Sequence, residues 1–277
     1  MAMSVHTNEA ALIALQNLNK TTSDLQDAQN KISTGLAIGS AKDNAAVWAI
    51  AQGQRADIGS LGAVKMSLDR ATSIADVAST AGATISDLLV QMKEKVVAAM
   101  DPSLDTASRT ALDSDFKSIL RQITQVIQNA NFDGANMLDG SVPQIKFIAY
   151  ADANGFITLS SQNLSLGGGI ITVPSTASLS TITFATAVLA SLTTSISNTN
   201  QALGNLGSQA KQLSNHADFV SKLTDQLTAG VGNLVDADLA KESARLQALQ
   251  VQQQLGTQAL SIANQAPQVI LSLFKGG

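Results

Sequence analysis

The sequence contains no cysteine, and aromatic residues make up only 3% of its 277 residues. The absence of cysteine excludes disulfide bonds, thiolate metal sites and cysteine nucleophiles. Charged residues make up only 14% and give a formal net charge of -4, so the chain lacks the basic patch that nucleic-acid binding needs. The hydrophobic 45% is therefore mostly aliphatic, which favours long helices over an aromatic-rich enzyme core.

The amino-terminal segment lacks the features of a secretory signal peptide. No basic residue precedes Lys20, and no unbroken apolar run follows the first methionine. Nowhere does the sequence contain the run of about 18 apolar residues that a transmembrane helix requires. We therefore expect neither a cleaved signal peptide nor insertion into a membrane.

Hydrophobic residues recur with a heptad period in two long segments, which predicts helices that pack as in coiled coils. The first stripe alternates steps of three and four and ends before Asp101-Pro102; it comprises Leu61, Val64, Leu68, Ala71, Ala75, Ala78, Gly82, Ile85, Leu89, Met92, Val96 and Ala99. The second stripe comprises Leu192, Ile196, Thr199, Leu203, Leu206, Ala210, Leu213, Ala217, Val220, Thr224, Leu227, Val231 and Leu234. These stripes predict a mainly α, elongated, coiled-coil helical bundle.

Two shorter segments lie between the long stripes. Residues 112–130 carry a third apolar stripe, which we expect to pack antiparallel on the first helix and to end at Asn131-Phe132-Asp133-Gly134. Residues 144–160 alternate with a period of two around Asn154-Gly155, which predicts a small β-hairpin in the middle of the chain. Too few residues remain for a large inserted domain.

The two ends of the chain carry the same heptad register, and the carboxyl-terminal one lacks the charged face of a surface helix. Residues 247–274 contain no charged residue, and eight of these 28 residues are glutamine. A monomeric surface helix normally carries charges on its solvent face. We therefore expect both terminal segments to be surrounded by neighbouring subunits and to fold only on assembly. The candidate packing residues are Leu18, Leu25, Ile32, Leu36, Leu239, Leu246, Leu249, Leu260 and Leu273.

Several segments resemble the signatures of bacterial flagellins. At the amino-terminal end they are Asn17-Leu18-Asn19-Lys20 and the run from Ile32-Ser33-Thr34-Gly35 to Asp43-Asn44-Ala45-Ala46. At the carboxyl-terminal end they are Asp236-Ala237-Asp238-Leu239-Ala240-Lys241-Glu242, Gln253-Gln254-Leu255-Gly256 and Ala263-Asn264-Gln265-Ala266-Pro267-Gln268 through to Leu273. Asn131-Phe132-Asp133-Gly134 and Leu138-Asp139-Gly140 match as well, so the resemblance covers nearly the whole chain.

The resemblance implies a structural subunit that polymerises into the flagellar filament for swimming motility, in a short form without large outer domains. It implies a discontinuous core domain of paired terminal helices, residues 1–43 with 236–277, and a rod-like helical bundle, residues 44–235. Its implied partners are other copies or related flagellins, the flagellar cap and hook-junction proteins, the export apparatus and an export chaperone. The implied location is the extracellular filament, reached unfolded through the flagellar type III channel without a cleaved signal peptide.

The chain departs from the family pattern at identifiable positions. The family usually has arginine where Ala37 stands, and a small residue or leucine where Val47-Trp48 stand. In flagellins sensed by the animal innate immune receptor, an Arg and a Leu flank an Arg-Glu pair, and the corresponding places here are Gln91 and Lys95. We therefore expect weak activation of that receptor.

No enzymatic site, cofactor site or metal site is predicted. Gly35 to Lys42 superficially resembles a phosphate-binding loop, but the lysine comes two residues late and no buried strand precedes it. His6 and His216 are the only histidines and have no zinc-binding spacing. Acidic residues from Asp236 to Glu242 are those expected at a helix start. The alternative function is that of a hook-filament junction protein of the same family. A helical export chaperone or a soluble binding module fits the uncharged terminal helix poorly, and the sequence offers no convergent set of titratable residues for an enzyme.

Overall fold

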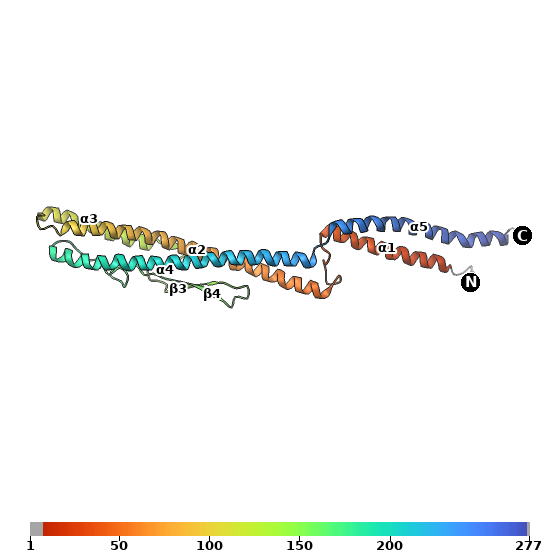
Figure 1. The fold of residues 1–277 in the computed structure, drawn as a ribbon, viewed down its shortest axis with the longest axis horizontal. Coiled ribbons are helices and arrows are strands. Elements are labelled where there is room, and N and C mark those ends of the chain that lie inside the picture. The colour runs from red at the N-terminus through yellow and green to blue at the C-terminus, as the bar shows by residue number, and fades with distance from the viewer. Residues whose placement is uncertain (1–7, 276–277) are drawn as a thin grey trace. The chain divides into compact units, whose positions relative to one another are not determined.

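The computed structural model describes the backbone of residues 8–275 and the side chains of residues 8–265. Its elements are α1 (Glu9–Thr34), α2 (Ala45–Ala99), α3 (Thr106–Asn129), β1 (Asn131–Phe132), β2 (Ala135–Asn136), β3 (Gln144–Ile148), β4 (Phe156–Ser160), α4 (Ile182–Val235) and α5 (Leu239–Lys275). The mainly α class predicted from the sequence is confirmed (Figure 1). The chain forms two compact units, residues 57–225 and residues 1–56 with 226–277, and both α2 and α4 contribute to each.

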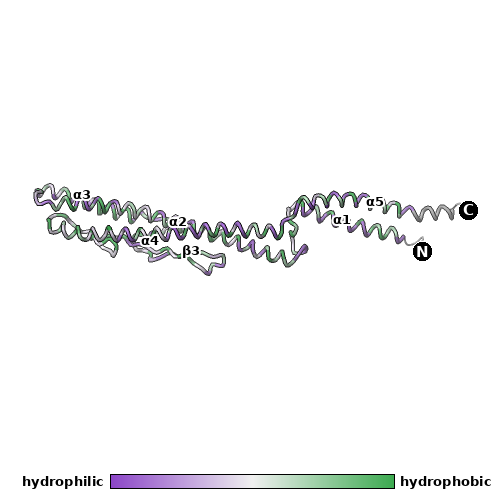
Figure 2. Tube along the Cα trace, viewed as in Figure 1, coloured by the Kyte–Doolittle hydropathy of each residue, from purple (hydrophilic) through white to green (hydrophobic). Residues whose placement is uncertain are grey.

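Within residues 57–225, the apolar stripe of α2 is buried without exception. All twelve predicted positions from Leu61 to Ala99 are buried, and Leu68, Ala71, Ala75, Ile85, Leu89, Met92, Val96 and Ala99 are fully enclosed. Apolar and polar residues alternate along α2 and α4, as expected of helices with one apolar side (Figure 2). The small residues of the stripe allow close approach, because a Cβ built on Gly82 would lie 2.3 Å from Leu203 Cδ2 of α4.

Helix α4 runs antiparallel to α2 in this unit. Lys65 Nζ donates to Ser221 Oγ at 3.1 Å, and Ser86 Oγ donates to Asn200 Oδ1 at 3.3 Å, so the paired residue numbers run in opposite directions. The predicted stripe of α4 is buried or half-buried from Leu192 to Val231.

The last position of the α4 stripe was predicted wrongly. Leu234 is 40% exposed, whereas the next residue, Val235, is 2% exposed. On a straight helix a strict seven-residue repeat drifts by about 20° per heptad. Six heptads separate Leu192 from Leu234, so the drift amounts to about one residue, and the buried position moves on to Val235.

Helix α3 packs antiparallel on the end of α2, as predicted. Asp105 caps its first turn by accepting from Ser108 N at 2.7 Å, and Lys95 Nζ lies 2.9 Å from Asp115 Oδ2. The apolar side of α3 is buried through Phe116, Ile119, Leu120, Ile123 and Ile127. Helix α2 ends at Ala99, one residue before Asp101-Pro102, where the sequence predicted its end.

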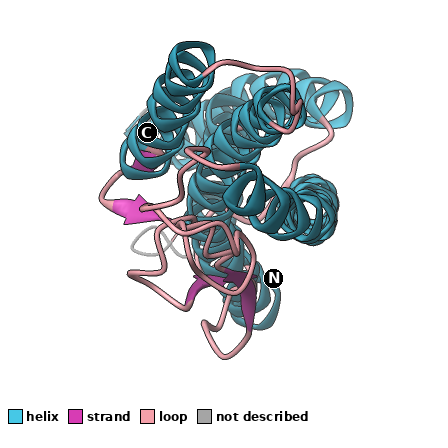
Figure 3. Cartoon of the chain, turned by 90° about the vertical axis from the view of Figure 1, so that its left-hand side faces the viewer, coloured by secondary structure: helices cyan, strands magenta, loops and turns pink. Residues whose placement is uncertain are grey.

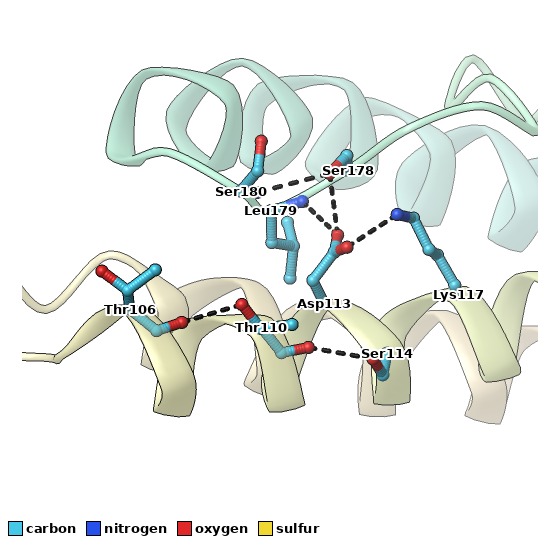
Figure 4. Close-up of polar contacts among 8 residues, drawn as sticks. All are labelled: Thr106, Thr110, Asp113, Ser114, Lys117, Ser178, Leu179 and Ser180. Atoms are coloured by element: carbon cyan, nitrogen blue, oxygen red, sulfur yellow. Dashed lines mark hydrogen bonds and ion pairs between the residues drawn. The ribbon is translucent and has the colours of Figure 1, made fainter.

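Two buried polar residues of α3 hold neighbouring segments in place. The Arg109 guanidinium donates to the carbonyl oxygens of Ala99 and Asp101 and so caps the end of α2. One turn later, Asp113 accepts from Leu179 N at 2.6 Å and from Ser178 Oγ at 2.9 Å. Lys117 Nζ lies 2.7 Å from the other Asp113 oxygen (Figure 4). The segment before α4 is thereby fixed to α3.

The Asp113 carboxyl is kept ionised although it is buried. Burial raises its pKa, but the hydrogen bond from Lys117 and those from Leu179 N and Ser178 Oγ outweigh burial, and the pKa lies below its usual value. The ionised form therefore contributes to holding these segments together.

The predicted β-hairpin of residues 144–160 is confirmed. Strands β3 and β4 pair antiparallel with Gln144 opposite Ser160 and Ile148 opposite Phe156. Ile148 N donates to Ser67 Oγ of α2 at 3.2 Å, and Ser160 N donates to Gln209 Oε1 of α4 at 2.6 Å. The hairpin is thus fastened to both long helices, and its strands lie among loops beside the helices in Figure 3.

A second, smaller hairpin lies where the sequence analysis expected only a helix end. Strands β1 and β2 pair around Asp133 and Gly134, both of which have positive φ, 51° and 79°. Two consecutive positive φ values are typical of a type I′ turn, for which Asp-Gly is a preferred sequence. The signal was present, but two-residue strands are too short to show an alternating pattern.

Candidate assembly surface

The terminal helices α1 and α5 pair antiparallel. Asn8 Nδ2 donates to Ala263 O at 2.7 Å near one end of the pair, and Gln253 Nε2 lies 3.4 Å from Thr22 Oγ1 further along. The N-terminal part of α1 therefore lies beside the C-terminal part of α5 (Figure 1). The pairing of the two ends predicted from the sequence is confirmed.

The core between these two helices is small. It consists of Leu25, Ala28 and Leu249, with the half-buried Leu246 packed against it. Close approach continues at Gly256, where an added Cβ would lie 3.2 Å from Leu18 Cδ1.

A large part of the apolar surface of α1 and α5 is exposed in the described residues. The exposed fractions are 56% for Leu12, 54% for Ile13, 43% for Leu15, 50% for Leu239, 55% for Val251, 58% for Leu255 and 70% for Ile262. We call these seven residues the open apolar set. From Gln247 onward the described part of α5 has no charged side chain to solvate this surface. An exposed apolar surface without charges is typical of a protein interface.

The structure places the predicted packing residues in three environments. Leu25 and Leu249 are buried against each other's helix. Leu239 is half-exposed. The remaining ones are half-buried, namely Leu18, Ile32, Leu36, Leu246 and Leu260. Leu273 lies outside the residues whose side chains are described.

Most of the open apolar set could not be predicted from the heptad pattern. Leu12, Ile13, Val251, Leu255 and Ile262 lie off the heptad stripe and were therefore not selected. The available signal was a local one: each is a large apolar residue in a stretch with few or no charges. A search for apolar residues on all sides of the helix would have found them.

The flagellin-like segment after α1 connects the ends of the two terminal helices. Gly35 has φ 72° and ends α1 by donating from its N–H to Lys31 O at 2.9 Å. This left-handed conformation is the usual helix end for glycine. A single antiparallel β-bridge then joins Leu36 to Asp236.

Further main-chain hydrogen bonds strengthen this bridge. Ala37 N and Ile38 N both donate to Val235 O, at 2.7 and 3.2 Å, and Ala237 N donates to Gly35 O at 2.8 Å. The bonds around Ala37 are made by its backbone, so they do not depend on the side chain in which the sequence departs from the family.

The next residues start α2 and α5. Asp43 accepts from Gly39 N at 3.1 Å and from Ser40 N at 2.9 Å, and its pKa is lowered, chiefly by the backbone hydrogen bond from Ser40. Asn44 caps α2 by accepting from Val47 N, and Asp238 caps α5 by accepting from Lys241 N. Within the loop that resembled a phosphate site, the N–H groups of Gly39 and Ser40 are therefore bound by a carboxylate of the chain itself, and those of Ala37 and Ile38 by a main-chain carbonyl.

Several residues considered in the sequence analysis lie elsewhere. Trp48 is half-buried in the first turn of α2. Gln91 is exposed, and Lys95 forms its ion pair with Asp115. His216 Nε2 lies 2.9 Å from Ala149 O at the hairpin, and His6 falls outside the described residues.

The described residues form neither a metal site nor a membrane-spanning helix. No three His, Asp or Glu side chains gather there in a way that could hold a metal ion. None of the described helices is long and apolar enough to span a membrane.

Comparisons with known proteins agree with the terminal motifs. The family model described as the bacterial flagellin N-terminal helical region matches residues 5–142, and that of the C-terminal helical region matches residues 189–274. Flagellin FljJ of Caulobacter vibrioides is 54% identical over 280 residues, covering 100% of both chains. Flagellin FljM of the same organism is 51% identical over 98% of both chains, and a flagellin of Brucella melitensis is 38% identical over 99% of both.

Two solved structures share the fold. The crystal structure of Bacillus cereus flagellin matches 60% of this chain and 94% of its own with a TM-score of 0.50 and 21% sequence identity. A putative flagellar hook-associated protein from Vibrio parahaemolyticus matches 70% of this chain and 100% of its own with a TM-score of 0.58 and 12% identity.

Proposed function

This chain belongs to the bacterial flagellins and is a structural subunit of the flagellar filament, and from that premise we propose that α1 and α5 form its main contact with neighbouring subunits. The observation that carries the proposal is the open apolar set. Seven large apolar residues remain 43–70% exposed on a helix pair whose own core contains three buried residues. In a filament, neighbouring subunits would cover this surface and remove it from water.

The assignment divides the chain into two functional parts. Residues 1–43 with 236–277 would form the filament-core domain, and residues 44–235 the helical bundle outside it. Within the core domain, Leu25 and Leu249 serve the pairing of α1 with α5, since they are buried in the single subunit. Leu246 and Leu18 also touch the facing helix, at the small core and at Gly256, so they serve both the pairing and the contacts with other subunits. The other half-buried and exposed residues serve contacts with other subunits, namely Ile32, Leu36, Leu239 and Leu260; we assign Leu273 to the same group from its sequence position alone.

The same contrast supports folding of the terminal segments on assembly. Ordering a helix costs conformational entropy that apolar burial must offset. The α1–α5 pair buries few side chains by itself, so the helices would gain most of their stabilising burial from neighbours. We therefore propose that both terminal segments are disordered in the free monomer and become helical in the filament.

The partners follow from the family. Five flagellins of the single organism Caulobacter vibrioides are each 50–54% identical to this chain. The presence of several related flagellins in one organism supports a polymer that contains more than one of them. Cap and hook-junction proteins, the flagellar export apparatus and an export chaperone complete the proposed set. Export through the type III channel without a cleaved signal peptide would place the protein in the extracellular filament.

The comparisons do not favour the alternative role of a hook-filament junction protein. The relatives that match over the whole chain at 38–54% identity are named flagellins. The hook-associated protein from Vibrio parahaemolyticus shares only 12% identity, which indicates a common fold alone. The family is structural, so no enzymatic role is proposed.

We retain weak activation of the animal innate immune receptor as part of the proposal. Gln91 is exposed on α2, and Lys95 is held by Asp115 at 2.9 Å, so neither place presents the Arg or Leu of receptor-activating flagellins. Purified monomer should give little signal in reporter cells at a dose that saturates an activating flagellin. Robust signalling at that dose would contradict the expectation.

Paired charge substitutions test the assembly surface directly. We would compare Ile262→Lys on α5 with Val97→Lys on α2, because these side chains are 70% and 52% exposed and neither change buries a charge in the single subunit. Seeded polymerisation would be followed by sedimentation and electron microscopy. Ile262→Lys should abolish sedimentable filaments while Val97→Lys leaves them. Equal behaviour of the two variants would overturn the proposal, and circular dichroism of each monomer would verify that the bundle is folded.

A further inference from the structure

The turn between β3 and β4 contains the only Asn-Gly pair of the sequence, Asn154-Gly155. In such a pair the main-chain nitrogen of glycine can attack the side-chain amide carbon of asparagine. A carbon–nitrogen bond forms, ammonia leaves, and a five-membered succinimide results. Water then opens the ring to aspartate or to isoaspartate. No oxidant, reductant or enzyme is required, and glycine favours the attack because no side chain shields its nitrogen.

The local geometry leaves the reacting groups available. The Asn154 side chain is exposed, and Gly155 N donates no hydrogen bond to any described residue. Ala153 precedes the pair with φ 56°, a left-handed conformation in which non-glycine residues are uncommon. The pair therefore lies in an irregular turn in which Gly155 N, the reacting nitrogen, takes no part in the ladder of hydrogen bonds between β3 and β4.

Packing explains why glycine occupies position 155. A Cβ there would lie 1.7 Å from Tyr150 Cδ2, so the tyrosine ring occupies the space that any side chain would need. The ring in turn meets His216 edge-on, with centroids 6.1 Å apart. Removing the reactive pair by substituting Gly155 would therefore disturb the contact between the hairpin and α4.

Asp152 restrains the asparagine. Its Oδ2 accepts from Asn154 Nδ2 at 2.9 Å, and its Oδ1 accepts from Asn154 N at 3.2 Å. These bonds restrict rotation of the Asn154 side chain. A carboxylate so close also disfavours the negative charge that Gly155 N acquires as it loses its proton to become the nucleophile. Both effects slow the cyclisation.

We propose that Asn154 is a site of spontaneous deamidation whose rate is restrained by Asp152. The modification adds one negative charge at the hairpin turn. Isoaspartate also lengthens the main chain by one methylene group between Asn154 and Gly155. Gly155 O accepts from Ala149 N at 2.9 Å, and Ala149 O in turn faces His216 Nε2 at 2.9 Å. The lengthened turn would displace Tyr150 and loosen the attachment of the hairpin to α4.

The test is an ageing experiment on the full chain. Purified protein is incubated in warm neutral buffer, digested at intervals, and analysed by mass spectrometry for the replacement of an amide by a carboxyl group. Asn154 should be the first asparagine of the folded chain to convert, and both aspartate and isoaspartate should appear there. Intact Asn154 after another asparagine has converted would overturn the proposal.

Two substitutions of Asp152 test whether this residue slows deamidation at Asn154. Asp152→Ala should convert several-fold faster than the unmodified chain, because it loses both the hydrogen bonds and the charge. Asp152→Asn should fall between the two, because it keeps a side chain that can accept from Asn154. An unchanged or slower rate in Asp152→Ala would overturn the role of Asp152. Asn154→Gln is the matched control and should show no early conversion in the proteolytic peptide that contains position 154.

Nuclear magnetic resonance of His216 tests whether isoaspartate loosens the attachment of the hairpin to α4. His6 and His216 are the only histidines of the chain, so their imidazole signals are easily distinguished by nuclear magnetic resonance. The His216 signals should shift in step with the isoaspartate fraction, while those of Asn154→Gln remain constant over the same incubation. A constant His216 signal in a fully converted sample would contradict the predicted loosening.

Discussion

The bundle of residues 57–225 and the α1–α5 pair use the same heptad pattern with opposite results. In the bundle, every predicted position from Leu61 to Ala99 is buried within the chain itself. In the terminal pair, the buried core reduces to Leu25, Ala28 and Leu249, while seven other large apolar residues stay exposed. A heptad stripe therefore predicts that a helix will be packed, but not whether the packing partner belongs to the same chain.

The largest effect should come from removing one member of the terminal pair. A chain that ends at Leu234 lacks α5 entirely but keeps the buried stripes of the bundle. It should form no filaments even with seeds, because the exposed surface has lost most of its members, while circular dichroism shows a folded helical monomer. Filaments formed by this shortened chain would show that the bundle alone supports assembly, and would contradict the assignment of the subunit contacts to the terminal pair.

Truncating one leucine in each region sharpens the comparison. Leu68→Ala opens a cavity in the fully enclosed stripe and should cost about 2–5 kcal/mol of bundle stability. Leu255→Ala removes a side chain that is 58% exposed and should change monomer stability by less than about 0.5 kcal/mol. Chemical denaturation measures the first quantity. The critical concentration for polymerisation should rise for Leu255→Ala although its monomer is unaffected. Equal losses of unfolding free energy in Leu68→Ala and Leu255→Ala would contradict the difference between the two regions.

The sequence predicted the parts of the fold that depend on periodic burial. The α2 and α3 stripes and the hairpin from Gln144 to Ser160 could be predicted because burial imposes a period of seven or two along the chain. The pairing of the two ends followed from the resemblance to flagellins. The β1–β2 hairpin could not be predicted, because four residues carry no period. Nor could the clamp at Asp113, since its partners Ser178 and Leu179 are distant in sequence and only the folded chain brings them together.

Within the candidate site the limit was of a different kind. The heptad register predicted packing for Leu25 and Leu249 as for the other stripe residues, and only the structure shows that these two are buried between α1 and α5. Leu255 and Ile262 could not be assigned by the same rule, because residues that face a neighbouring subunit need not follow the heptad of the contact within the chain. The lack of charge in residues 247–274 was the better indicator of that surface.

The bundle should also have a pH response through Asp113. The folded-state pKa of Asp113 lies below its ordinary value of 3.8, so its ionised form stabilises the bundle fully above that value. The stabilisation decreases as the pH falls below the ordinary value and is lost once the pH passes the folded-state pKa. Near neutral pH, Asp113→Ala should destabilise the bundle by roughly 1–3 kcal/mol because Leu179 N loses its buried acceptor.

Acid titration distinguishes this clamp from a general effect of acid. The difference in unfolding free energy between the unmodified chain and Asp113→Ala should shrink as the pH decreases through the acidic range. Asp115→Ala is a suitable control, because its ion pair with Lys95 is exposed and such pairs contribute little. A difference for Asp113→Ala that stays constant down to strongly acidic pH would show that the carboxylate charge does not contribute.

The smallest expected effect concerns the contact between α1 and α5 at Gly256. Alanine is the better helix former by up to about 1 kcal/mol, but its Cβ would lie 3.2 Å from Leu18 Cδ1. Leu18 is only half-buried, so its side chain can shift by the few tenths of an ångström that the methyl group requires. Gly256→Ala should therefore leave the monomer nearly unchanged and slightly raise helicity in the terminal segments. If Gly256→Ala abolished filament formation while helicity rose, the close approach at this position would be needed for contacts with neighbouring subunits and not for the pairing of α1 with α5. Neighbouring residues on one helix would then serve different contacts.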